Sequence, residues 1–86
     1  MHETAIVTDL LGRAEAEARG DPAVIAALKF RIGALSGISS ESLRHCTDRV
    51  ALGMWGYSPE LHIEESHDPT DPNAQGVVLV SVRLEA

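Results

Sequence analysis

The stretch AVIAALKFRIGALSGISS, residues 23–40, decides the fold. In its first half apolar and charged residues alternate, which predicts a half-buried strand. The apolar side of this strand consists of Leu28, Phe30 and Ile32, and the charged side of Lys29 and Arg31. The second half turns at Gly37, and either Ser39 or Ser40 is suited to cap a helix that follows. A strand that leads into a helix is therefore the centre of the predicted fold.

The segment before this stretch predicts an amphipathic helix from Glu3 to Arg19. Its apolar residues recur at spacings of three and four, as one buried face of a helix requires. They are Ile6, Val7, Leu10, Leu11, Ala14 and Ala18. Gly20 is suited to the C′ position just past the helix end, and Pro22 cannot continue a helix. We therefore expect the helix to stop at the GDP turn.

The segment after the cap predicts a second helix that ends near LGMWGYSP, residues 52–59, where two glycines and a proline crowd together. Glu41 lies near the positive end of this helix, where a carboxylate is favourable. The predicted buried stripe consists of Leu43, Cys46 and Val50.

Two further strands follow. The segment ELHIEES, residues 60–66, alternates, with Leu61 and Ile63 directed inward. A polar loop, residues 67–76, then leads to a last strand, VVLVSVRLE, at residues 77–85. We expect the last strand to place four apolar side chains on one face, namely Val78, Val80, Val82 and Leu84.

These elements predict a single domain over residues 1–86, of the α+β class. Two helices that pack on one face of a three-stranded mixed sheet would bury every apolar stripe, in the order helix-strand-helix-strand-strand.

The composition limits the classes of partner. The net charge is −6 and no basic run is present, so nucleic acid is not an expected partner. No apolar run approaches the roughly 20 residues that cross a bilayer, so no membrane partner is expected. Cys46 is the single cysteine, which excludes an intrachain disulfide and a cysteine zinc cage. We expect a cytoplasmic protein.

The motifs of common enzyme classes are missing. No glycine-rich phosphate loop and no G-x-S-x-G frame occurs, and the serines of residues 36–42 are explained by caps and turns. His45 and Cys46 are neighbours on a helix, about 100° apart, and cannot face one site together. Cys46 is therefore interpreted as a small core residue. We expect that the chain is not an enzyme.

His62 lies on the outward side of its predicted strand between Glu60 and Glu64. Lys29 and Arg31 occupy the outward side of the first strand. This pattern is typical of a solvated sheet face with cross-strand charge pairs.

The N-terminal Met1, His2 and Glu3 offer a candidate metal site. The terminal amine, the amide nitrogen of His2 and its imidazole Nδ1 can close adjacent chelate rings around one ion. Such nitrogen sets suit Ni(II) or Cu(II). Glu3 would add its amide or its carboxylate, although a helix N-terminus favours an acid without any metal. A terminal histidine without any role is the alternative.

The segments MHE, LKFRIGALSGIS, ESLRHC, LHIEE and VVLVSVRLE, in this order, resemble the HypA/HybF family of nickel-handling hydrogenase maturation proteins. The resemblance spans nearly the whole chain. It implies a metallochaperone that passes Ni(II), bound transiently, toward the hydrogenase large subunit, together with a nickel-handling GTPase. Met1, His2 and Glu3 match the nickel-binding start of the family.

Two departures from the family pattern affect these implications. Members usually carry a zinc domain with two Cys-x-x-Cys pairs where this chain has loop 67–76, so no zinc is expected here. Some members also carry an acidic residue directly after SGI, where this chain has Ser39, and Glu41 is the candidate substitute.

The departures also leave an alternative function open: a metal-independent interaction module, or a subunit of a hydrogenase-related complex. Met54, Trp55 and Tyr57 would then form a contact segment, or else a lid over the core.

Overall fold

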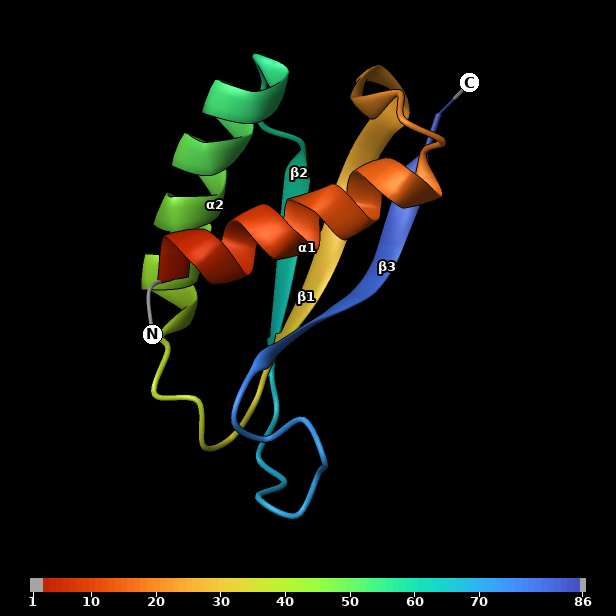
Figure 1. The fold of residues 1–86 in the computed structure, drawn as a ribbon. Coiled ribbons are helices and arrows are strands. Elements are labelled where there is room, and N and C mark those ends of the chain that lie inside the picture. The colour runs from red at the N-terminus through yellow and green to blue at the C-terminus, as the bar shows by residue number, and fades with distance from the viewer. Residues whose placement is uncertain (1–2, 86) are drawn as a thin grey trace.

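The computed structural model describes residues 3–85 (Figure 1). The predicted order of helix, strand, helix, strand, strand is confirmed, with one added 3-10 turn, η1. The elements are α1 (Glu3–Glu17), η1 (Pro22–Val24), β1 (Ile25–Ile32), α2 (Ser40–Trp55), β2 (Glu60–Glu65) and β3 (Val77–Leu84). None of the helices within these residues is both long and apolar enough to cross a membrane.

The sheet has the strand order β2-β1-β3. Strand β1 pairs with β2 in parallel and with β3 antiparallel, so the sheet is mixed, as predicted. The parallel pair needs a crossover connection, which α2 supplies. Helix α1 crosses over β1 and β3, and α2 runs beside β2 (Figure 1). The predicted α+β architecture is therefore confirmed.

The core lies between the helices and the sheet, around Phe30, whose exposed fraction is 0%. The inward side of β1 is buried, as its alternation predicted, and it belongs to the same core cluster as buried residues of both helices. The largest fully buried side chains are Phe30, Leu11, Ile25, Leu28, Leu43, Val7 and Thr47. Cys46 is 4% exposed within this core, which confirms its structural interpretation. Val50 is only partly buried and packs on the edge of the core.

The prediction that Val78, Val80, Val82 and Leu84 share one face of the last strand is wrong. Its register against β1 shifts between the pairs Lys29–Ser81 and Phe30–Leu79, as at a β-bulge. Beyond this shift the alternation changes phase, so the side chains that pack on the core are those of Val77, Leu79 and Val82. Val80, which lies between these two pairs, is 37% exposed, and Leu84, the last residue of β3, is 44% exposed. An extra residue in one strand moves every later side chain to the opposite face.

The end of the first helix also differs from the prediction. Helix α1 ends at Glu17, and both Arg19, with φ 56°, and Gly20, with φ 81°, have left-handed backbone conformations. The Gly20 amide donates to the Glu15 carbonyl at 2.9 Å and the Arg19 amide to the Ala16 carbonyl at 3.1 Å. These two bonds are those of a Schellman motif, which places Gly20 one position later than expected.

The first strand begins at Ile25, two residues later than the alternating stretch from Ala23 suggested. Ala23 and Val24 belong to the 3-10 turn η1, which starts with Pro22. Asp21 caps this turn by accepting a hydrogen bond from the Ala23 amide at 3.1 Å. Proline is preorganised for a first helical position, so the turn forms before the strand can start.

Loop 67–76 folds back on the end of β1. The Gly33 amide donates to the Gly76 carbonyl at 2.8 Å, and the Leu35 amide donates to the Ala74 carbonyl at 2.7 Å. Ala74 is 3% exposed, although its neighbours are polar. Asp68 also accepts a bond from the Thr70 amide at 2.9 Å, as in an Asx turn. The loop that connects β2 to β3 is therefore held against the end of β1 by backbone hydrogen bonds.

Trp55 and Tyr57 cover one end of the core. The indole of Trp55 donates to Glu15 Oε1 at 3.2 Å, which ties the end of α2 to α1. The Tyr57 hydroxyl lies within hydrogen-bond distance of the carbonyls of Pro22 and Ile25, at 2.8 Å from the latter. Burial, and next the charge of the Asp21 carboxylate, raise the pKa of Tyr57. These contacts fit the lid interpretation of the segment.

Tyr57→Phe is expected to lower the free energy of unfolding by about 1 kcal/mol, because it deletes one hydrogen bond and keeps the ring. For a domain of this size that is about 4–8 °C in melting temperature. Circular dichroism melts of both proteins measure it. An unchanged midpoint would mean that the hydroxyl prefers water to the two carbonyls.

Candidate functional site

The first turns of the two helices meet at one point of the molecule. Ser42, in the first turn of α2, donates its hydroxyl to Oε2 of Glu3, the first residue of α1, at 2.7 Å. Glu3 is partly buried, whereas Glu41 is exposed next to Ser42. The structure therefore brings Glu3 to the segment of α2 that carries Glu41. Met1 and His2 lie outside the described residues, so their part in the site stays a prediction.

The start of α2 is held in place by local hydrogen bonds. Ser39 is the N-cap, as predicted, with extended backbone angles, and its hydroxyl accepts from the Ser42 amide at 3.1 Å. Gly37, with φ 73°, provides the turn before it. Ser36 closes the turn by accepting from the Ile38 amide at 3.2 Å. Ser42 is thus presented from a fixed helical turn.

A second contact ties the start of α1 to α2. Arg49 Nη2 lies 3.3 Å from the hydroxyl oxygen of Thr4 and 3.6 Å from the sulfur of Cys46. The Thr4 hydroxyl and the Cys46 sulfur are 3.9 Å apart. The first turn of α1 is therefore held at both Glu3 and Thr4.

The sequence interpretation missed the role of Ser42. It assigned the serines of residues 36–42 to caps and turns, which is correct for Ser36 and Ser39. Ser42 instead reaches a carboxylate that is 39 positions away in the sequence. No local pattern could have revealed a partner at that separation.

The outward face of the sheet carries the charge pairs that the sequence predicted. Glu64 lies 3.7 Å from Lys29 Nζ and 3.3 Å from Arg31 Nη2. Glu60 lies 2.7 Å from His62 Nε2 and 3.8 Å from Arg83 Nη2. The hydrogen bond with His62, together with the positive charges nearby, lowers the pKa of Glu60. Within residues 3–85, no three His, Cys, Asp or Glu side chains are placed to hold a metal ion.

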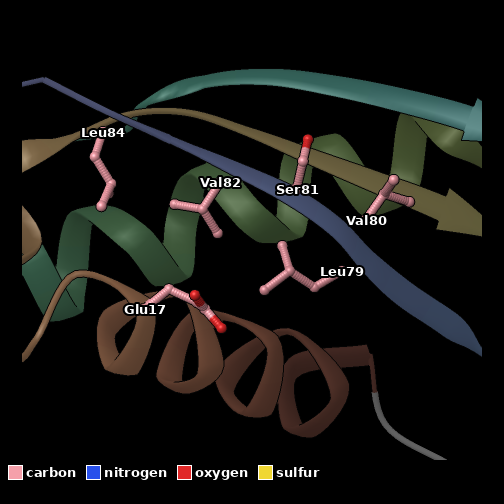
Figure 2. A pocket seen from close by; sticks show the side chains of 6 residues that line it. All are labelled: Glu17, Leu79, Val80, Ser81, Val82 and Leu84. Carbon is pink, nitrogen blue, oxygen red and sulfur yellow. The ribbon is translucent and has the colours of Figure 1, made fainter.

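A shallow pocket lies along β3, beside the last turn of α1 (Figure 2). Its volume is about 240 Å³, and Glu17 is its one charged lining residue among those described. The rest of the lining comes from β3: Leu79, Val80, Ser81, Val82 and Leu84. The Ser81 hydroxyl points away from Glu17 (Figure 2), so the pocket offers neither a nucleophile with a base nor a set of metal ligands. The pocket is separate from the contact between Glu3 and Ser42.

Comparison with known proteins gives the family. A family model described as hydrogenase/urease nickel incorporation, metallochaperone, HypA matches residues 1–70. Three similar proteins are each named hydrogenase maturation factor HypA. The protein from Chlorobium luteolum is 36% identical over 66 residues, which are 76% of this chain and 56% of that protein. That from Chlorobium limicola is 39% identical over 66 residues, with shares of 76% and 57%.

The third relative, from a Picosynechococcus species, is 40% identical over 65 residues, 74% of this chain and 58% of its own length. The chain thus matches less than two thirds of the length of these relatives. No solved structure matches the chain.

The family match includes Met1, His2, both helices and the first two strands, and it ends inside loop 67–76. It therefore contains Glu3, Glu41 and the helical turns that present them. The chain belongs to the HypA family, whose description is that of nickel-incorporation metallochaperones for hydrogenase and urease.

Proposed function

We propose that this chain binds Ni(II) weakly and transiently through Met1, His2 and Glu3 and passes it to a hydrogenase maturation partner. The observation that carries the proposal is the family match, which includes these three residues. The contact between Glu3 and the first turn of α2 supports it, because it attaches one proposed ligand to a folded element.

The proposed ligands divide between nitrogen and oxygen atoms. Met1 supplies its amine, and His2 supplies its amide nitrogen and imidazole. Glu3 supplies an amide or a carboxylate oxygen. Glu41, which is exposed and lies two positions after Ser39, is the proposed additional ligand. Nickel is cargo in this proposal, so no bond is made or broken in a substrate and no zinc site is needed.

The proposed partners are the hydrogenase large subunit, a nickel-handling GTPase, or both, in the cytoplasm. An open site near a chain end suits such a transfer, because an acceptor can replace the ligands one at a time. A carrier of this kind needs release as much as capture.

His2→Ala is expected to weaken Ni(II) binding strongly, because it removes an imidazole ligand from the metal itself. The loss should exceed the roughly 10- to 100-fold that removal of an outer partner of a ligand causes. Titration calorimetry on tag-free protein that starts at Met1 measures it. A variant extended by one residue before Met1 should also bind more weakly, because the amine is displaced.

His62→Ala is the matched control, because His62 is exposed and lies on the outward face of the sheet. Its affinity for Ni(II) should equal that of the parent protein. If the His2→Ala variant bound Ni(II) with the same affinity as the parent protein, the proposed site would be contradicted.

A metal-independent interaction module is the second candidate. The free edge of β3 favours it, because Val80 and Leu84 are 37% and 44% exposed there and strand edges readily pair with another chain. Absence of stoichiometric Ni(II) binding by the parent protein would favour this candidate over the first.

A further inference from the structure

Glu3 and Glu41 are the two proposed nickel ligands whose side chains the structure describes, and Glu3 is already engaged by another side chain. Ser42 Oγ lies 2.7 Å from Glu3 Oε2, a distance typical of a hydrogen bond to an ionised carboxylate. A carboxylate has two oxygens with about four acceptor sites, and Ser42 occupies one of them. Within residues 3–85 no other hydrogen bond engages this carboxylate, so Oε1 can bind a metal ion.

The hydroxyl that engages Glu3 comes from a rigid part of the fold. The Ser42 amide is bonded to the N-cap residue Ser39, and the next residue, Leu43, is 0% exposed in the core. A serine side chain has a single heavy-atom torsion, so a fixed backbone leaves its oxygen few positions. Figure 1 shows the start of α1 lying against α2, where this contact is made.

A carboxylate held in this way loses less conformational freedom when it binds a metal ion. An unrestrained glutamate side chain gives up about 1.5–2 kcal/mol of rotamer entropy when it is fixed. Groups that orient the ligands of a metal are for this reason nearly as important as the ligands.

We propose that Ser42 is a positioning residue of the nickel site. It acts on the metal only through the carboxylate of Glu3. This role rests on the proposed function and extends it, because a residue in the first turn of α2 would orient a metal ligand that belongs to α1. Ser42 itself does not touch the metal.

Ser42→Ala is expected to weaken Ni(II) binding by about 10-fold, the lower end of the range for residues that orient a ligand. Titration with a nickel salt alone, on tag-free protein of residues 1–86, measures the dissociation constant. Ser42→Thr keeps a hydroxyl at the same carbon and should restore most of the affinity. Circular dichroism of each metal-free variant at the titration temperature verifies that it is folded.

Ser40→Ala is the matched control. Ser40 is in the same turn of α2, and its side chain makes no hydrogen bond to another described residue. This variant changes the composition and the propensity of the turn in the same way as Ser42→Ala. Its affinity for nickel should equal that of the parent.

A double-mutant cycle separates positioning from a general structural role. In a Glu3→Ala background no carboxylate is left to orient, so Ser42→Ala should have no further effect on nickel affinity. An equal loss in both backgrounds would overturn the positioning role. Parent-like affinity of Ser42→Ala would also overturn it while leaving the proposed function intact. Absence of stoichiometric nickel binding by the parent would overturn the proposed function and this inference together.

Discussion

Phe30→Ala is expected to remove about 3–5 kcal/mol from the free energy of unfolding, as for other large aromatic truncations in a core. Phe30 is 0% exposed within β1 and belongs to the core cluster. Single domains are typically stable by about 5–15 kcal/mol, so a loss of this size is a large part of the total and unfolds a substantial fraction of a domain at the lower end of that range.

Urea denaturation followed by circular dichroism measures this effect as a lower midpoint with an unchanged slope. Leu35→Ala is the control, because Leu35 is 56% exposed and its truncation should change stability by less than about 0.5 kcal/mol. Similar midpoints for the two variants would contradict the assignment of Phe30 to the core.

Gly33→Ala is expected to lower the free energy of unfolding by about 1–3 kcal/mol, the usual cost of forcing an extra carbon into a packed site. A Cβ at Gly33 would lie 2.2 Å from the backbone oxygen of Ala74, far inside van der Waals contact. Because that neighbour is backbone, loop 67–76 would have to move away from β1. The hydrogen bonds from Gly33 to Gly76 and from Leu35 to Ala74 would be strained or lost.

Gly12→Ala carries the same chemical change at a site with nothing within 4 Å of the added carbon. Gly12 lies within α1, so this control should gain up to about 1 kcal/mol from helix propensity. Chemical denaturation of the two variants gives the comparison. If both substitutions moved the midpoint in the same direction, loop 67–76 would not be docked at Gly33.

Local patterns were enough for the order and the type of the elements. The alternation of β1 identified its buried side, and the spacing of three and four residues identified the buried face of α1. Ser39 was correctly predicted as one of two candidate caps of α2. These features depend on residues within about one turn or two strand positions, so the sequence carries them directly.

The candidate site was predictable only in part. The residues Met1, His2 and Glu3 were selected from their chemistry and from the family resemblance, and the family match includes them. Glu41 was selected from its distance along the chain to the SGI segment. That Glu3 meets the first turn of α2, which carries Glu41, required the two helices to be placed together, because the contact joins positions 3 and 42.

Local sequence patterns were sufficient to predict the two helices and three strands, their order, the buried faces of α1 and β1, and the charged outward face of the sheet. Only the tertiary structure decided the bulge that exposes Val80, the docking of Ala74 under Gly33, and the bond between Ser42 and Glu3. Each of these depends on a partner that is distant in the sequence. Periodicity shows which side of an element is apolar, whereas the choice of partner depends on how whole elements pack.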